Sequence, residues 1–128
     1  MLNLLQINLR KSKVAQDLLM QVAAERKIDV LLVSEQFGNL DTSSSYQDSS
    51  KRAGIIMHNK KLKVKAHQRT KFGFVWVEVN DVRIYSCYFP PYNDQFLKFK
   101  NDIDELKSSI AMATCEVLIA GDFNSKSP

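Results

Sequence analysis

The sequence lacks several features by which common classes of protein are recognised. It has no apolar run of membrane-spanning length, and its N-terminus shows no secretory pattern, so we expect no membrane partner. Its two cysteines, Cys87 and Cys115, lie far apart, in or beside strand-like runs. This spacing argues against a disulfide framework and predicts reduced, buried thiols in an intracellular protein. There are no internal repeats.

The sequence also lacks the patterns of two kinds of site. It has four glycines but no glycine-rich phosphate loop, which argues against a nucleoside triphosphate-binding fold. Its two histidines, His58 and His67, do not have the spacing of metal ligands, and its cysteines are isolated. Both observations argue against a zinc site.

The composition is that of one modest globular domain. The 128 residues are 45% hydrophobic and 25% charged, and no linker or shift in composition divides them. Lys and Arg number 18 against 14 Asp and Glu, which gives a net charge of +4. That excess permits a polyanionic partner without requiring one.

The first part of the chain alternates between strand and helix patterns. Leu2–Leu9 is short and apolar-rich and predicts a first strand that ends in Asn8. Lys13–Lys27 predicts a helix, and Val30–Val33 predicts a strand that is covered on both faces. This order favours an α/β layered fold. The expected buried face of the helix consists of Val14, Leu18, Leu19 and Val22.

The middle of the chain contains a polar stretch followed by strands. Gly38–Arg52 is rich in Ser and Asp and predicts a mobile loop. Ala53–His58 predicts a strand, and Leu62–Arg69 alternates basic and apolar residues like an edge strand. The next two strands, Phe74–Val79 and Val82–Phe89, form a hairpin pattern around a tight Asn-Asp turn.

The last part of the chain predicts a helix and a final strand. Pro90 and Pro91 stop the hairpin, and Asn93 or Asp94 can cap a helix that runs to about Ala113. Val117–Ala120 is a continuous apolar run that predicts a buried strand. The expected buried face of the helix consists of Phe96, Phe99, Ile103, Leu106 and Ile110.

The segment after this strand is the first candidate site. Gly121 permits a sharp turn, and Asp122 and Asn124 point the same way in extended backbone because they are two residues apart. A carboxylate can hold a metal or orient a nucleophile, and an amide can donate to a phosphoryl oxygen. The segment is equally typical of an ordinary turn, so these residues alone leave both interpretations open.

Further polar residues follow other predicted strands. Taken singly, Asn8 is typical of a turn, Glu35 of a solvated strand end and Tyr88 of a core aromatic residue. Taken together with Asp122 and Asn124, they predict one site, because ligands of α/β sheets gather beyond strand ends. One Glu with neutral amides nearby suits Mg²⁺.

Four segments carry a resemblance to a known family. They resemble, in order, the motifs of the endonuclease/exonuclease/phosphatase superfamily: Gln6–Arg10, Leu32–Glu35, Tyr85–Pro90 and Gly121–Asn124. The chain is most similar to the apurinic-like endonuclease domain at the N-terminus of non-LTR retrotransposon polyproteins that carry a reverse transcriptase. Two stretches are particularly similar to that group, namely Trp76–Val79 leading into Tyr85–Tyr88, and Gly121–Pro128. The resemblance covers essentially the whole chain.

The resemblance implies a fold, an activity and roles for residues. The fold would be a two-sheet α/β sandwich of the DNase I-like type, and the activity metal-dependent cleavage of DNA that nicks a target for insertion, in the nucleus. Glu35 would hold Mg²⁺ or Mn²⁺ with Asn8 beside it, and Tyr88 would contact the scissile phosphate. Asp122 would orient the attacking water. The implied substrate-binding residues are Arg10, Tyr88, Asn93 and Asn124.

The sequence departs from the family pattern in three places. Relatives often have Pro where Gln36 stands, and many have Asn sooner after the prolines than Asn93, which puts substrate contacts in doubt. The family also continues to a further Asp and a terminal Ser-Asp-His motif, and neither His58 nor His67 has a matching context. Residues 1–128 are therefore expected to be the N-terminal portion of the domain, with the C-terminal strands missing.

Three functions stay open at this point. The chain is an incomplete endonuclease whose partners are DNA, the rest of the domain and a reverse transcriptase. Otherwise it is a non-catalytic remnant that binds nucleic acid, or a phosphatase or phosphodiesterase of the same superfamily. The basic residues mildly favour DNA; they are Lys60, Lys61, Lys63, Lys65, Arg69 and Lys71.

Overall fold

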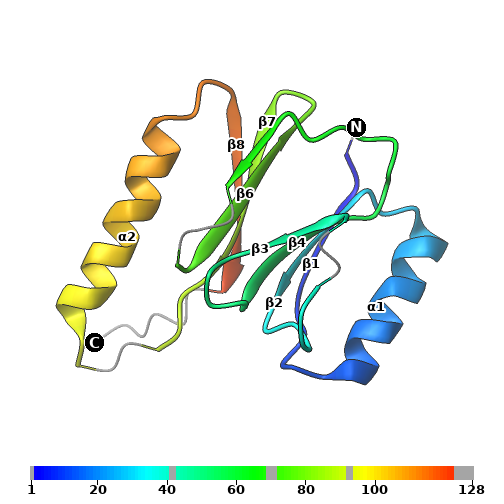
Figure 1. Cartoon of the computed structure of the whole chain (residues 1–128), viewed down its shortest axis with the longest axis horizontal. Helices are drawn as coiled ribbons and strands as arrows, with labels where there is room; N and C mark the ends of the chain where they lie inside the picture. The colour runs from blue at the N-terminus through cyan, green and yellow to red at the C-terminus, as the bar shows by residue number, and fades with distance from the viewer. Residues whose placement is uncertain (1, 41–42, 69–71, 92–93, 123–128) are drawn as a thin grey trace.

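Two four-stranded sheets pack face to face, with one helix on each outer side (Figure 1). The computed structural model describes residues 2–40, 43–68, 72–91 and 94–122. The elements are β1 (Leu4–Asn8), α1 (Lys13–Arg26), β2 (Val30–Ser34), β3 (Ser45–Gln47), β4 (Ala53–Met57), β5 (Ala66–Gln68), β6 (Phe74–Val79), β7 (Val82–Tyr88), α2 (Phe96–Ala111) and β8 (Glu116–Asp122). The predicted two-sheet α/β sandwich is confirmed.

The two sheets have matching designs. Their strand orders are β1-β2-β4-β3 and β5-β6-β7-β8. In each sheet one parallel pair is joined through a helix, β1 and β2 through α1, and β7 and β8 through α2, and the other pairings are antiparallel. The registers pair Asn8 with Ser34 and Tyr88 with Asp122. The carboxyl ends within each parallel pair therefore lie together.

The core between the sheets comes from alternate residues of the central strands. β2 and β4 are buried along their whole length, because each inner face meets the other sheet and each outer face meets other parts of the fold. This confirms the strand predicted at Val30–Val33. The inter-sheet cluster comprises Val30, Leu32, Ala53, Ile55, Met57, Val75, Val77, Val79, Ile84 and Tyr88.

Helix α1 forms where it was predicted but buries a different face. Ser12 caps it by accepting a hydrogen bond from the Ala15 backbone N–H at 3.1 Å. Its buried residues are Leu19 and Ala23, whereas Val14 and Leu18 are exposed. The predicted burial is confirmed for Leu19 and wrong for Val14, Leu18 and Val22. Small alanine side chains, which carry little hydrophobic signal, let the helix approach the sheet closely on another face.

The loop predicted at Gly38–Arg52 is wrong in its second half. Strand β3 forms there and pairs with β4, and Asp48 after it is 2% exposed. This polar stretch can form a strand because pairing with β4 uses backbone N–H and C=O groups, which are available at the edge of a sheet whatever the side chains are. Strand β5 is shorter than the predicted Leu62–Arg69, of which Arg69 lies outside the described residues.

The final strand also differs from its prediction. β8 is an edge strand that pairs with β7, and Leu118 and Ile119 are 38% and 43% exposed, so it is not a buried strand. It runs through Gly121 to Asp122 rather than turning at the glycine. Gly121 has φ +152°, and a Cβ there would lie 2.1 Å from the Cys87 carbonyl oxygen. The glycine thus permits close approach of the two strands.

The hairpin between β6 and β7 is confirmed, with Asn80 and Asp81 at φ 48° and 62°.

Helix α2 starts later than predicted, after Gln95, and no side-chain hydrogen bond caps it. Asp94 therefore does not act as the cap, and Asn93 lies outside the described residues. Phe96 is exposed, contrary to prediction, because it lies in the first turn, beyond the sheet. Neither α1 nor α2 has the length and apolar character of a membrane-spanning helix. The residues of α2 that pack on the second sheet are Ile103, Leu106 and Ile110.

Candidate active site

The space between the sheets changes from apolar to polar at one edge. Along β2 the inward positions run from Leu32 to Ser34, and along β7 from Ile84 to Ser86. The Ser86 hydroxyl donates to the Val33 carbonyl at 3.3 Å and so links the two sheets. The other inward-facing strand ends at this edge are Asn8, Tyr88 and Asp122.

A single amide holds two carboxylates at this edge. The Asn8 Nδ2 group donates to Glu35 Oε2 at 2.7 Å and to Asp122 Oδ2 at 3.0 Å. Its Oδ1 atom accepts from the Arg10 backbone N–H at 2.8 Å. The two sheets are thereby joined by the very residues that the strand-end pattern singled out.

The backbone around Glu35 is tightly fixed. Its N–H donates to the Arg52 carbonyl at 2.7 Å, and its carbonyl accepts from the Lys11 N–H at 2.6 Å. Glu35 has φ 50°, in the left-handed region that is unfavourable for a residue with a Cβ. Lys11, Arg10 and Lys51 at the same edge also have positive φ. Such strain persists only where surrounding contacts fix it, and it is common at functional sites.

Tyr88 lies beside the carboxylates with 7% of its surface exposed. Its pKa is raised, chiefly because burial disfavours the phenolate, and the charges of Glu35 and Asp122 raise it further. Arg52 acts in the opposite direction and lowers the pKa of Tyr88 through its charge and a hydrogen bond. The phenol therefore stays protonated at neutral pH and can donate a hydrogen bond to an anionic oxygen.

The sequence-predicted site residues divide into three groups. Asn8, Glu35, Tyr88 and Asp122 lie together, as described above. Arg10 contributes its backbone N–H to Asn8, and its side chain is exposed. Asn93 and Asn124 lie outside the described residues, so their predicted roles stay predictions.

Arg52 was missed by the sequence analysis, and so was Asp48, which positions it. Both fall in the stretch that was interpreted as a mobile loop. The guanidinium carbon of Arg52 lies 5.9 Å from the centroid of the Tyr88 ring. No local signal in the sequence places Arg52 near Tyr88, because β4 and β7 belong to different sheets.

The oxygen groups at this edge fit a hard divalent cation. Mg²⁺ takes one or two carboxylates and keeps several waters, and Glu35 can supply a carboxylate. Ser34, the register neighbour of Asn8, has a buried hydroxyl oxygen without a hydrogen-bond partner in the described part of the chain. Over that same part no group of three or more Cys, His, Asp or Glu residues could form a closed cage. Asn8 would have to turn to offer its oxygen, because its nitrogen faces both carboxylates.

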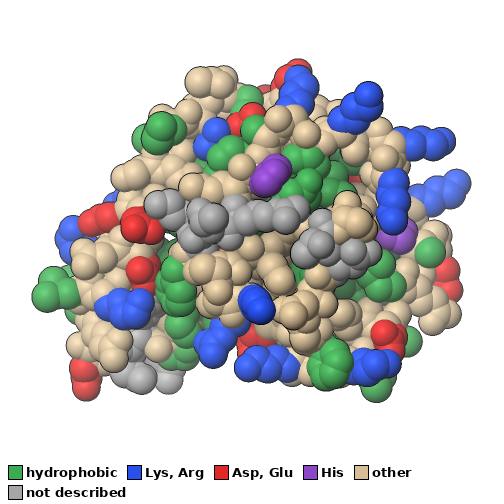
Figure 2. Space-filling model, viewed as in Figure 1, with side chains coloured by type: hydrophobic (Ala, Val, Ile, Leu, Met, Phe, Trp, Pro, Cys, Tyr) green, Lys and Arg blue, Asp and Glu red, His purple; other side chains and the backbone are tan. Residues whose placement is uncertain are grey.

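The described part of the predicted basic stretch lies at the end of the molecule away from this site, and Arg69 and Lys71 lie outside the described residues. Lys60–Lys65 follows the Met57 end of β4, which pairs with Val30, whereas the site lies at the Ala53 end. Lys65 bonds to Asp81 in the β6–β7 turn, at 3.1 Å. Other basic residues flank the site instead. In Figure 2, Lys and Arg side chains lie along the lower edge and at the upper right of the view. The flanking residues are Arg10, Lys11, Lys51 and Arg52.

Neither the histidines nor the buried cysteine joins the site. His58 bonds through its backbone to Asp29 at the far end, and the His67 ring packs 4.8 Å from that of Tyr46. Burial raises the pKa of Cys87 to about 12, so its thiolate is not available as a nucleophile at neutral pH. Cys115 is only half-buried, contrary to prediction.

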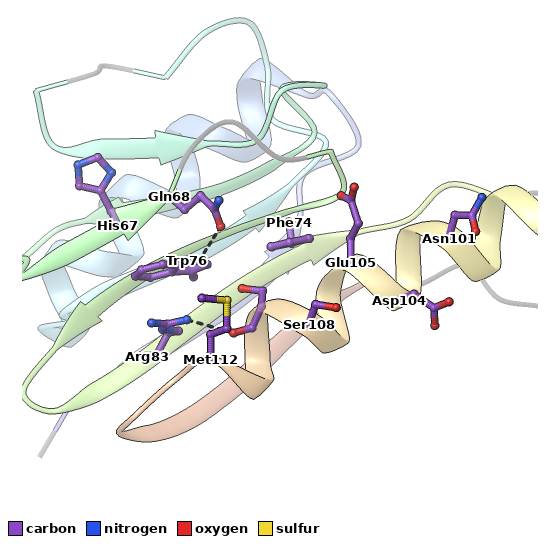
Figure 3. Close-up of a pocket in the computed structure, with 11 residues that line it drawn as sticks. His67, Gln68, Phe74, Trp76, Arg83, Asn101, Asp104, Glu105, Ser108 and Met112 are labelled. Carbon is purple, nitrogen blue, oxygen red and sulfur yellow. Dashed lines mark hydrogen bonds between the residues drawn. The ribbon is translucent and has the colours of Figure 1, made fainter.

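A separate groove of about 890 Å³ lies between the second sheet and α2 (Figure 3). The Arg83 guanidinium stacks 3.8 Å from the Trp76 ring and pairs with Glu78 at 2.7 Å. Trp76 in turn donates to Gln68 at 2.9 Å. Trp76, Arg83 and Gln68 are thus engaged in contacts within the second sheet, and none of the strand-end residues described above lines the groove.

Comparison with known proteins identifies the architecture. No protein-family model matches the chain, and no curated protein matches it by sequence. A solved structure of the endonuclease domain of TRAS1, a telomere-specific non-LTR retrotransposon, superposes with a TM-score of 0.76 at 21% identity. This match covers 99% of the present chain and 61% of that chain. The chain has the DNase I-like endonuclease/exonuclease/phosphatase fold.

A second structure with this fold is similar. D. rerio TDP2, humanized by 14 mutations, superposes with a TM-score of 0.71 at 14% identity, over 98% of the present chain and 63% of that one. The fold predicted from the four motifs is confirmed. The chain spans about three fifths of the length of both structures.

Proposed function

We propose that this chain carries the catalytic edge of a metal-dependent DNA endonuclease, which hydrolyses a phosphodiester bond and nicks target DNA for retrotransposon insertion in the nucleus. The observation that supports this most is the Asn8 amide, which joins Glu35 and Asp122 where both parallel strand pairs end. The buried Tyr88 phenol beside them adds a hydrogen-bond donor for a phosphate oxygen.

Each residue has a defined task in this proposal. Glu35, with Asn8 beside it, would hold Mg²⁺ or Mn²⁺, which when bound neutralises charge on the phosphate. Asp122 accepts a hydrogen bond from the attacking water and orients it, and Tyr88 donates to a phosphate oxygen. Phosphoryl transfer depends mainly on such positioning and charge stabilisation. Asn124, Asn93 and Arg10 retain their predicted roles as substrate contacts.

Proton transfer is expected to need a further group. The two histidines of the chain lie away from Asp122, as described above. We therefore propose that the histidine implied by the family resemblance belongs to the remainder of the domain, within a polyprotein that also carries a reverse transcriptase. Loss of a positioned proton-transfer group removes about 10²- to 10⁴-fold in rate. The chain alone should then cleave DNA only slowly.

The basic residues around the site favour DNA over a small phosphoester. Arg10, Lys11, Lys51 and Arg52 lie on both sides of Glu35 along the edge, where an extended polyanion can contact several of them at once. A phosphatase or phosphodiesterase acting on a small ester would not need this spread of charge. Affinity that increases with DNA length supports the first function, and affinity independent of length favours the second.

A supercoiled-plasmid nicking assay with Mg²⁺ tests the proposal, using the chain and the longer product that contains it. Glu35→Gln and Asp122→Asn should each abolish nicking by the longer product, while Asp17→Asn on the exposed side of α1 should not. Nicking that survives both active-site changes would refute the assigned residues. Robust nicking by the chain alone would show that it needs no further proton-transfer group, and binding of DNA without any nicking would favour a non-catalytic remnant.

A further inference from the structure

Arg52 occupies a position at the site that its sequence context does not reveal. It directly precedes β4, and its carbonyl accepts the Glu35 N–H at 2.7 Å. Its side chain is exposed and lies over the Tyr88 ring, with the guanidinium carbon 5.9 Å from the ring centroid. A permanent positive charge therefore lies beside the tyrosine, at the edge that carries Glu35.

Asp48 holds Arg52 and Tyr88 in these positions through hydrogen bonds to backbone groups. Its carboxylate is almost completely buried and accepts hydrogen bonds from the backbone of Arg52 at 3.0 Å and of Ala53 at 3.1 Å. Its other oxygen accepts from Gly73 N–H at 2.8 Å, and the Gly73 carbonyl accepts from the Tyr88 N–H at 2.8 Å. One side chain thus sets the backbone positions of Arg52 and, through Gly73, of Tyr88.

We propose that Arg52 binds a substrate phosphate beside Tyr88, and that Asp48 is the positioning residue that holds the pair together. This inference rests on the proposed function to the extent that the ligand is a DNA phosphodiester. Two carboxylates at the same edge repel a phosphate, and a fixed cation beside them offsets this repulsion. A guanidinium is suited to this, because its planar donors bind two phosphate oxygens at once.

The neighbouring Lys51 provides a charge-matched control, because it is also exposed and also flanks the site. Binding of a short fluorescent DNA duplex to the full chain is measured in EDTA, so that the result does not depend on metal or cleavage. Arg52→Gln should weaken binding about tenfold or more, and Arg52→Lys should restore only part of it. Lys51→Gln should weaken binding about two- to threefold, as expected of general charge.

The position of Arg52 is tested separately by the NMR signals of the Tyr88 ring, recorded with ring-labelled tyrosine. Arg52→Gln should shift these signals, because the guanidinium carbon lies 5.9 Å from the ring centroid. Lys51→Gln should leave them unchanged. In an Asp48→Asn background, Arg52→Gln should have a smaller effect on both binding and the ring signals, because Arg52 is no longer held in place.

Equal losses of DNA affinity in the Arg52 and Lys51 variants, or Tyr88 ring signals that are unchanged in Arg52→Gln, would overturn the proposal. An absence of DNA binding by the unmodified chain would do the same. If Asp48→Asn does not fold, the Arg52 and Lys51 variants still decide the role of Arg52, because both side chains are on the surface. Failure of the nicking assay alone would refute the proposed catalysis and leave this binding result standing.

Discussion

The two ends of the space between the sheets are built from the same strands but contain different side chains. At the far end Leu4, Met57 and Val79 fill it, and at the site end Asn8 and Asp122 do. On β7 the change occurs within two residues, from Ile84 to Ser86 (see above). The apolar end stabilises the fold, because burial of apolar surface is the main favourable term in folding. The polar groups at the other end contribute less burial energy, which is the pattern of residues retained for chemistry.

The backbone shows the same difference. At the far end the left-handed residues are Lys27, which ends α1, and Asn80 and Asp81 in the β6–β7 turn, where that conformation is favourable for Asn and Asp. At the site end they are Arg10, Lys11, Glu35 and Lys51, for which it is unfavourable. The strained backbone is therefore concentrated beside the carboxylates.

The largest expected effect comes from shortening one inward side chain at the apolar end of β7. Ile84→Ala should lower the free energy of unfolding by about 3–5 kcal/mol, because it leaves a cavity between the sheets. Ser86→Ala, two residues along the same strand, should lower it by about 1 kcal/mol or less, since it removes one 3.3 Å hydrogen bond. Urea denaturation measures both. Equal losses would show that the two ends contribute alike.

Gly121→Ala tests the close approach of β7 and β8 at the site end. It should lower the free energy of unfolding by about 3 kcal/mol, because its Cβ would collide with the Cys87 carbonyl. Gly38→Ala is the control, since Gly38 also has positive φ but no atom lies within 4 Å of an added Cβ. It should have an effect of about 1 kcal/mol. Equally mild effects of the two substitutions would show that the contact with Cys87 does not restrict position 121.

The smallest effects are expected from pH, which should act on the two ends separately. At the far end, hydrogen bonds from the Asn3 backbone and from Asn59 lower the pKa of Asp29 below 3.8, so its contribution is lost as pH falls through that lowered value. At the site end, burial raises the pKa of Tyr88 above 10.0, so its contribution is lost as pH rises through the raised value.

Asp29→Asn should therefore flatten the acid limb of a stability–pH profile, and Tyr88→Phe should flatten the alkaline limb. Each variant should leave the other limb as it is in the unmodified chain. Denaturation midpoints measured across the pH range give both limbs in one series. A change of both limbs in either variant would mean that the two ends do not titrate independently.

Much of the fold follows from local patterns in the sequence. Val30–Val33 and the hairpin strands are runs of β-branched and aromatic residues, and strand formation and burial both follow from that composition. The site residues Asn8, Glu35 and Asp122 could be found because polar groups at strand ends are positioned by the sheets themselves. Because the ends of paired strands lie together, the positions of the strands alone predict which polar side chains lie close to one another.

The remaining features depend on contacts that no local pattern contains. The buried face of α1 uses Ala23, whose small side chain gives no hydrophobic signal. β3 forms because backbone groups of β4 are available to it, and β8 is exposed because the described part of its sheet ends there. Arg52 becomes part of the site only when the two sheets pack. Each of these outcomes is decided by distant residues, which the local sequence does not specify.

The central claim is that the polar end, and not another acidic part of the surface, binds a divalent cation. Mn²⁺ added in small steps to the isotope-labelled chain should broaden the NMR signals of Asn8, Glu35 and Tyr88 first. Glu35→Gln should remove this selective broadening, and Glu78→Gln, whose carboxylate pairs with Arg83 away from the site, should not. Broadening that begins at Asp81 or Asp104, or that is the same in Glu35→Gln, would contradict the account.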